Sequence, residues 1–271
     1  MKQILLRGVF CAAAISGFSL EVQPWFGDVY QFHLAACYSY SRFNSVQGGI
    51  PQLTSPFNEN LIYLGLEFCP SPEWSLDIDL QTASTSKIDF YFRSGALQIR
   101  YLWLDDLIGD PISFATGVSA RATPSRALTD FSNPSHANLD FEADFSLGKE
   151  WDASENFRWR LWFFGALGHG NRGSPWVRGI FTTETNIHHQ HRLGVYAAAS
   201  NGYGRHSHVR TENFHGYAKI RQKSIDLGIW YGFRLDVWGS LRFGYERRVL
   251  AKASPQNINS FIASYSLPFS F

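Results

Sequence analysis

Phe261-Ile-Ala-Ser-Tyr-Ser-Leu-Pro-Phe-Ser-Phe271 ends the sequence with an apolar or aromatic side chain at every second position. Side chains of a β-strand point alternately to two faces, so this stretch predicts a strand with one apolar and one polar face. The apolar face carries Phe261, Ala263, Tyr265, Leu267, Phe269 and Phe271. The other face carries Ser264, Ser266 and Ser270. One face therefore suits lipid and the other suits a polar interior.

This ending, with an aromatic residue in the last position, resembles the terminal strand of bacterial outer-membrane β-barrels. The resemblance is to the class as a whole and not to a specific family. It implies an all-β fold, a transmembrane antiparallel β-barrel in the bacterial outer membrane. It also implies two partners, namely the surrounding outer-membrane lipid or lipopolysaccharide and the barrel-assembly machinery, which would bind through Phe271.

The N-terminus has the layout of a secretory signal peptide. A basic start, an apolar run and a small-x-small cleavage motif follow one another in Lys2, Arg7, Val9–Phe18 and Gly17-Phe18-Ser19. We therefore expect a signal peptide over residues 1–19, export into the periplasm, and one barrel domain over residues 20–271. Cys11 offers a lipoprotein alternative, which the bulky Phe10 before it disfavours.

Composition narrows the function classes. The chain is 16% aromatic and 45% hydrophobic, has nine Trp, and carries a formal net charge of +1, which gives no indication of nucleic-acid binding. After residue 19 it has no run of eighteen apolar residues, so a helical membrane anchor is excluded. Cys37 and Cys69 are too few for a disulfide scaffold, and we expect no cofactor.

Period-two alternation continues through the chain. In Trp74–Gln81, for example, Leu76 and Ile78 oppose Asp77 and Asp79. Further strands are expected over 30–43, 61–68, 96–104, 112–121, 139–147, 157–164, 225–235 and 241–250, with two or three more over 177–217. Single-chain barrels use even strand numbers, so we expect twelve strands, with ten or fourteen as alternatives. A soluble all-β protein is the other structural alternative.

Connection length orients the predicted barrel. Short turns at 69–73, 105–110, 152–156 and 236–237 alternate with longer loops at 44–60, 123–138, 169–175 and 252–257. Short turns face the periplasm in this class. Aromatic side chains would then gather at the periplasmic rim, among them Trp74, Trp103, Trp151, Trp159, Trp238, Phe269 and Phe271.

The polar faces predict a lumen in which the two signs of charge nearly balance. The expected lumen charges are Asp77, Asp79, Asp140, Glu142, Asp144, Arg158, Arg160, Asp226, Arg234, Arg242, Glu246 and Arg248. Two interpretations stay open. One is an interior filled by ion pairs, because charges withdrawn from water need partners. The other is a water-filled passage that screens solutes by its transverse field.

The favoured function is therefore a structural or porin-like small-solute channel barrel, with a surface-binding barrel or adhesin as one rival. A lipid acyl hydrolase is another rival. Ser200-Asn201-Gly202 is similar to the Ser-Asn-Gly of outer-membrane phospholipase A, but Ala198 stands where that enzyme has its His base. His206 and His208 would have to replace it. The alternative is a simple Asn-Gly turn.

Two surface patterns complete the candidate sites. His189 and His191 are weak metal-ligand candidates, because alternate residues share a strand face and neutral imidazole binds zinc or copper. Lys219, Arg221 and Lys223 extend the apolar face of the strand predicted over 225–235. We expect them just outside the hydrocarbon, where they could bind lipid phosphates or simply extend into solvent.

Overall fold

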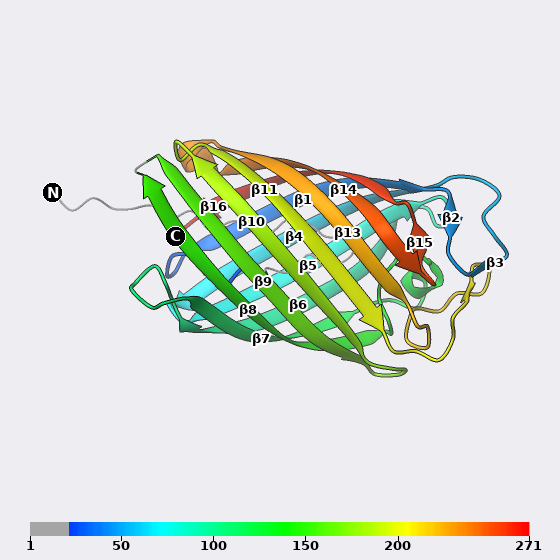
Figure 1. The fold of residues 1–271 in the computed structure, drawn as a ribbon. Helices are drawn as coiled ribbons and strands as arrows, with labels where there is room; N and C mark the ends of the chain where they lie inside the picture. Colours follow the sequence, from blue (N-terminus) through cyan, green and yellow to red (C-terminus); the bar gives the residue numbers. More distant parts are fainter. Residues whose placement is uncertain (1–21, 155, 271) are drawn as a thin grey trace.

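A computed structural model describes residues 22–154 and 156–270 as a closed barrel of twelve antiparallel strands (Figure 1). The strands are β1 Phe32–Phe43, β4 Phe57–Ser71, β5 Trp74–Thr85, β6 Tyr91–Leu104, β7 Ser113–Ala122, β8 Leu139–Ser154, β9 Phe157–Gly170, β10 Trp176–Ile187, β11 His191–Gly202, β13 Lys223–Arg234, β14 Ser240–Lys252 and β16 Asn259–Phe269. Each pairs with its neighbour along the chain, and β1 pairs with β16 to close the cylinder. The expected fold class and strand number are confirmed, with two barrel strands from 177–217.

Two expectations concern residues beyond this description. The proposed signal peptide, residues 1–19, and the role of Phe271 in barrel assembly both fall outside the described residues. Within the described ranges, no helix is long and apolar enough to cross a membrane.

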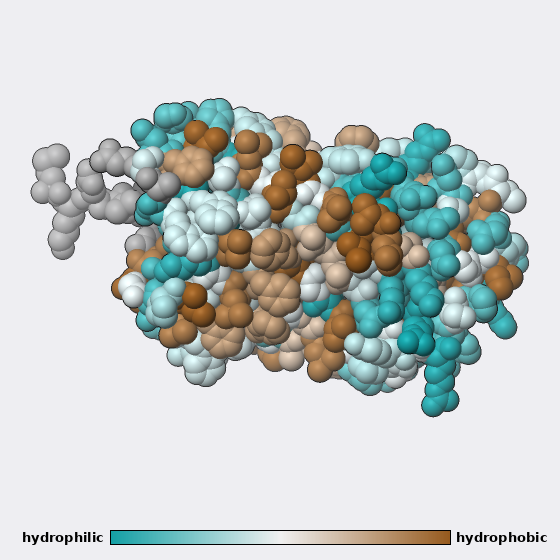
Figure 2. Space-filling model, in the orientation of Figure 1, coloured by the Kyte–Doolittle hydropathy of each residue, from teal (hydrophilic) through white to brown (hydrophobic). Residues whose placement is uncertain are grey.

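The two strand faces predicted from the sequence are the outer and inner faces of the barrel. On β5, Ile78 is 48% exposed, whereas its neighbour Asp79 is fully buried inside. On β13, Leu227 and Ile229 are exposed, and Asp226 between Leu227 and Ile225 is buried. Outward apolar side chains form a brown band across the barrel, and hydrophilic residues dominate the end opposite the C-terminus (Figure 2).

Pairing of the first and last strands removes both sheet edges. Leu34 lies opposite Leu267, and Tyr40 lies opposite Phe261. In hydrocarbon an unpaired edge would expose a row of N–H and C=O groups at several kcal/mol each, so closure is required. Pro268, which lacks an N–H, lies one residue from the end of β16, where a missing ladder bond is tolerated.

The two ends of the barrel differ. The turn end holds the short connections, the C-terminal end of β16 and the start of β1, while the loop end holds the long connections. Short strands β2 Ser45–Val46, β3 Gly49–Ile50, β12 Val209–Arg210 and β15 Pro255–Gln256 tie the long loops together, β15 with β2 and β12 with β3. The 3-10 helices are η1 Ala127–Thr129 in a loop and η2 Asp236–Trp238 in a turn. Five predicted rim tryptophans, Trp74, Trp103, Trp151, Trp159 and Trp238, are exposed at the turn end.

Candidate functional site: the barrel lumen

Ion pairs fill the walls of the lumen. Six arginines each meet a buried carboxylate: Arg93–Glu59 at 2.5 Å, Arg100–Asp144 at 3.7 Å, Arg121–Asp79 at 3.0 Å, Arg178–Glu142 at 2.8 Å, Arg192–Glu184 at 3.4 Å and Arg248–Asp226 at 2.6 Å. Arg158 and Arg160 share Glu150. The pairing offsets the desolvation that burial of each charge costs.

The remaining predicted lumen charges have other contacts. Asp140 accepts backbone N–H bonds from residues 136 and 137 at 2.9 Å each, and Asp77 accepts a hydrogen bond from Ser75. Glu246 accepts a hydrogen bond from the hydroxyl of Tyr196 at 2.9 Å. The guanidinium of Arg242 lies 3.9 Å from the ring centroid of Trp230. The side chain of Arg234, at the turn end of β13, is half-exposed.

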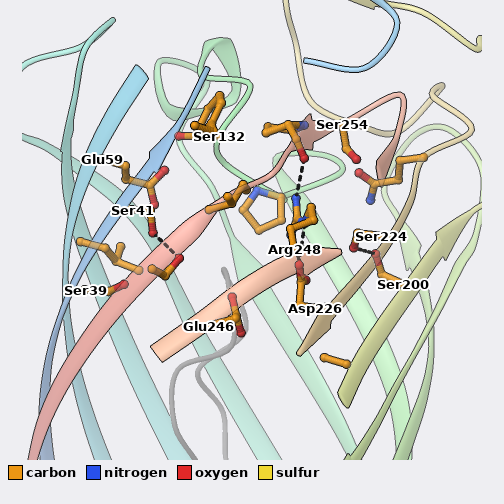
Figure 3. A pocket seen from close by; sticks show the side chains of 18 of the residues that line it. Ser39, Ser41, Glu59, Ser132, Ser200, Ser224, Asp226, Glu246, Arg248 and Ser254 are labelled. Carbon is orange, nitrogen blue, oxygen red and sulfur yellow. Dashed lines mark hydrogen bonds and ion pairs between the residues drawn. The ribbon is translucent and has the colours of Figure 1, made fainter. Parts of the chain in front are cut away.

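A cavity opens into the lumen near the loop end (Figure 3). It holds about 990 Å³ of space not filled by atoms, part of it open to solvent. Hydroxyl groups dominate its polar lining, and two pairs of them are bonded across neighbouring strands, Ser41 to Ser260 at 2.7 Å and Ser200 to Ser224 at 2.9 Å. Three acids and three arginines also line it: Glu59, Asp226, Glu246, Arg93, Arg178 and Arg248. The cavity therefore has a mixed lining, in which apolar side chains lie beside hydroxyls and charged groups, with no excess of either charge.

The loop between β7 and β8, residues 123–138, folds inward and forms part of the cavity wall. The imidazole of His136 stacks on Trp176 with ring centroids 3.7 Å apart, and burial lowers the His136 pKa to about 3. Tyr217 from the loop before β13 donates its hydroxyl to the carbonyl of Phe131 at 2.6 Å. Lys87 joins the two loops, because its Nζ donates to the carbonyls of Thr129 and Thr211.

The segment Val22–Gly27 lies inside the barrel between this cavity and the turn end. Val22 is 2% exposed and packs in a cluster of inward side chains: Phe164, Ala166, Ile180, Tyr196, Ala198 and Trp230. Ile180 and Ala198 also line the cavity, so this cluster is its floor. Trp25, 3% exposed, donates its indole N–H to Asp106 at 2.8 Å.

Arginines of the wall hold the same segment. Arg100 donates to the carbonyl of Gln23 at 2.6 Å and lies over the ring of Phe26 at 5.4 Å. Arg160 lies over the ring of Trp25 at 4.9 Å. Gly148 on β8 gives the segment room to pack against the wall, because a Cβ at that position would come within 2.6 Å of Pro24 and 2.8 Å of Trp25. These contacts hold Val22–Gly27 inside the lumen, and we call this segment the plug.

The hydrolase and metal candidates are not assembled. Ser200 bonds to Ser224, whereas His206 and His208 are exposed outside strands, and His206 bonds through its backbone to Lys219. The Asn-Gly turn alternative is wrong, because β11 continues to Gly202. His189 is exposed in the turn before β11, and His191 meets the hydroxyl of Tyr231 at 2.7 Å. Among the described residues, no group of three or more His, Cys, Asp or Glu could hold a metal ion.

Lys219, Arg221 and Lys223 are all exposed, Lys223 as the first residue of β13 and the other two in the loop before it. Sequence reasoning missed the plug and the inward loop. Neither has period-two alternation, because both lie within the lumen instead of spanning the wall. Pro24 and Trp25, just before the first strand, are the only sequence signal of the plug that could have been used.

Comparison with known proteins agrees with the architecture. No protein-family model matches the chain, and no curated protein matches its sequence. An outer-membrane channel from Pseudomonas putida F1 superposes with a TM-score of 0.62 at 11% identity, over 90% of this chain and 97% of that one. The NanC porin superposes with a TM-score of 0.55 at 10% identity, over 86% and 98%. The chain therefore has the fold of a bacterial outer-membrane β-barrel.

Proposed function

We propose that the protein is a channel for small polar solutes in the bacterial outer membrane, closed in this state by the plug Val22–Gly27. The observation that carries the proposal is the cavity inside the lumen at the loop end, which is lined by hydroxyls and balanced charges and has the plug beneath its floor. A barrel that served only as a scaffold would gain nothing from an internal cavity that is open to solvent. Ion pairs and a hydrophobic cluster line the bore around the plug.

The charges of the cavity indicate the class of solute. Its three acids and three arginines include two direct pairs, Glu59 with Arg93 and Asp226 with Arg248. Paired charges attract neither anions nor cations strongly, because the field of each is largely cancelled by its partner. Hydroxyls can donate and accept, so they can replace the hydration of an uncharged polar solute. We expect weak ion selectivity.

The short turns and the exposed tryptophans support an orientation with the turn end in the periplasm. A solute would then enter the cavity from outside and meet the plug before the periplasm. Opening requires Trp25 to leave its packing against the wall. Loss of a buried Trp side chain costs about 3 kcal/mol, which corresponds to about a hundredfold change in an opening equilibrium.

Conductance in planar bilayers tests the proposal. We expect rare openings from the natural protein and about a hundredfold more open time when Trp25→Ser and Val22→Ser are combined. Trp238→Ser is the matched control, because Trp238 lies at the same end but is 72% exposed. Heat-modifiable migration on gels shows that each variant is folded. If the folded double variant conducts no more than the natural protein, the barrel is a filled scaffold and the proposal fails.

A further inference from the structure

Five cations lie on the outward face of β13 and β14 and in the segment that leads into β13. All are exposed, and we call them the basic wall patch: Lys219, Arg221, Lys223, Arg247 and Lys252. The patch extends the sequence-predicted trio onto the neighbouring strand. His206 borders it, because its backbone N–H donates to the carbonyl of Lys219 and its carbonyl accepts from the N–H of Arg221.

Strand register sets two lysines against each other. The pairing of β13 with β14 shifts register between Ile225 and Asp226, so that Ile225 faces Leu250 whereas Asp226 faces Arg248, and Val249 of β14 is the extra residue. Lys223 consequently faces Lys252 across the ladder, and both side chains are exposed. Like charges directly opposite on one face of a sheet are destabilising. A bound anion would remove that repulsion.

No acidic residue at these strand ends supplies the negative charge that would offset the repulsion between the two lysines. Residues 217–225 and 247–258 contain neither Asp nor Glu. The next acids along the two strands, Asp226 and Glu246, are buried on the lumen side, where Asp226 pairs with Arg248 and Glu246 accepts from Tyr196. The counter-charge of the basic wall patch must therefore come largely from outside these strands.

The patch lies at the edge of the band of outward apolar side chains that surrounds the barrel, which we call the apolar belt. Ile225, next to Lys223 on the outward face, is followed by Leu227 and Ile229, which are about half exposed. Two residues of strand span roughly 7 Å, so Lys223 lies about that far beyond Ile225. Arg247 faces Leu227 within the belt, and its long side chain can extend toward the lysines while its stem stays in hydrocarbon.

We propose that the basic wall patch binds the phosphate groups of membrane lipid headgroups in the leaflet at the loop end, as on a phosphorylated glycolipid. The proposal rests on the membrane location given under the proposed function. The edge of an apolar belt is where headgroup phosphates lie, whereas a soluble anion has no reason to prefer this level. Lysine ammonium groups and the arginine fork are both donors for phosphate oxygens, and the arginine can bind two of them at once.

Thermal unfolding of the purified full chain, followed by heat-modifiable migration, tests this site. The additives are micelles of a phosphorylated lipid A, the same glycolipid with its phosphates removed, and inorganic phosphate. We expect stabilisation by the phosphorylated lipid alone. The apparent affinity should fall at least tenfold in Lys223→Gln/Lys252→Gln, since each cation near an anionic membrane surface is worth about fivefold. Arg126→Gln/Arg172→Gln, which removes two exposed cations outside the patch, is the matched control.

The sign of the lysine effect separates binding from a structural role. In neutral detergent without phosphate, Lys223→Gln should unfold at the same temperature as the natural chain or higher, because it removes repulsion. In phosphorylated lipid it should unfold at a lower temperature. Equal stabilisation by both glycolipid forms, or by inorganic phosphate, overturns the proposal. The assay does not depend on conductance. If the barrel conducts but its stability does not respond to lipid phosphate, only this binding site is contradicted. If its stability responds to lipid phosphate but the barrel never conducts, only the channel function is contradicted.

Discussion

Trp25 meets Trp162 edge to face inside the barrel, with ring centroids 5.8 Å apart and planes at 84°. This geometry is favourable for aromatic pairs, and it joins the segment before the first strand to the middle of β9. Trp162 is itself 3% exposed and lumen-facing, as the alternation of the sequence predicts. The wall therefore offers a shaped site for the plug, and this relationship underlies the first two predictions.

Replacing Gly148 by valine should expel the plug without unfolding the barrel. A Cβ there would lie 2.6 Å from Pro24 and within 3.0 Å of Trp25, so the new side chain and the plug cannot share the space. We expect open time to rise as strongly as in the Trp25 variant. Gly244→Ala is the control, because its nearest neighbours lie at the ordinary distance of 3.5 Å. Unchanged conductance in a folded Gly148→Val protein would show that the plug does not close the passage.

Replacing Gly27 by cysteine should lock the base of the plug. A Cβ at Gly27 would lie 3.3 Å from the Sγ of Cys69, which is a free buried thiol, so the two sulfurs can form a disulfide after a small adjustment. We expect oxidation to abolish openings and a reductant to restore them, with mass spectrometry identifying the linked peptides. Gly27→Cys/Cys69→Ser must show no redox effect. Openings that persist in the linked protein would mean that solutes bypass the plug.

The directions of the strand side chains could be predicted from the sequence, whereas the segments that lie inside the lumen could not. Alternation placed Ile78 outside and Asp79 inside because a strand side chain has only two directions. The facing of Lys223 and Lys252 depends on a bulge, which shifts register by one residue and leaves no reliable signal in local composition. Trp25 and His136 are inside because of tertiary contacts with distant strands, and no local period describes those contacts.

Removing Arg93 should destabilise the barrel and release the inward loop together. Its guanidinium binds Glu59 at 2.5 Å and donates to the carbonyl of Ser132 at 3.0 Å, so Arg93→Met leaves a buried carboxylate unpaired. We expect a loss of about 3–5 kcal/mol in urea unfolding from lipid vesicles. Glu59→Leu/Arg93→Met should recover most of it. Asp152→Asn, in a pair exposed at the turn end, should cost less than about 1 kcal/mol, and equal losses in both sites would contradict the account.

Acid should undock the loop 123–138 through His136. Burial lowers the pKa of this imidazole from 6.5 to about 3, so the docked loop stays unprotonated where the free loop binds a proton. Docking is therefore fully stable above pH 6.5 and weakens as pH falls toward 3, by up to about tenfold per pH unit. The neutral ring also accepts from the amide of Gln222 at 3.1 Å, a contact that the imidazolium would lose.

Hydrogen exchange of the loop amides, corrected for the free-peptide rate at each pH, measures this undocking. Two carboxylates face the histidine region, Asp140 through the backbone N–H of His136 and Glu142 through its charge, so the variant must isolate the ring. His136→Phe keeps a flat ring for Trp176 and has no proton to bind. Its protection should be nearly independent of pH between 6.5 and 4, whereas Asp140→Asn should keep the histidine slope. An acid dependence identical in the natural chain and His136→Phe would assign the effect to the carboxylates instead.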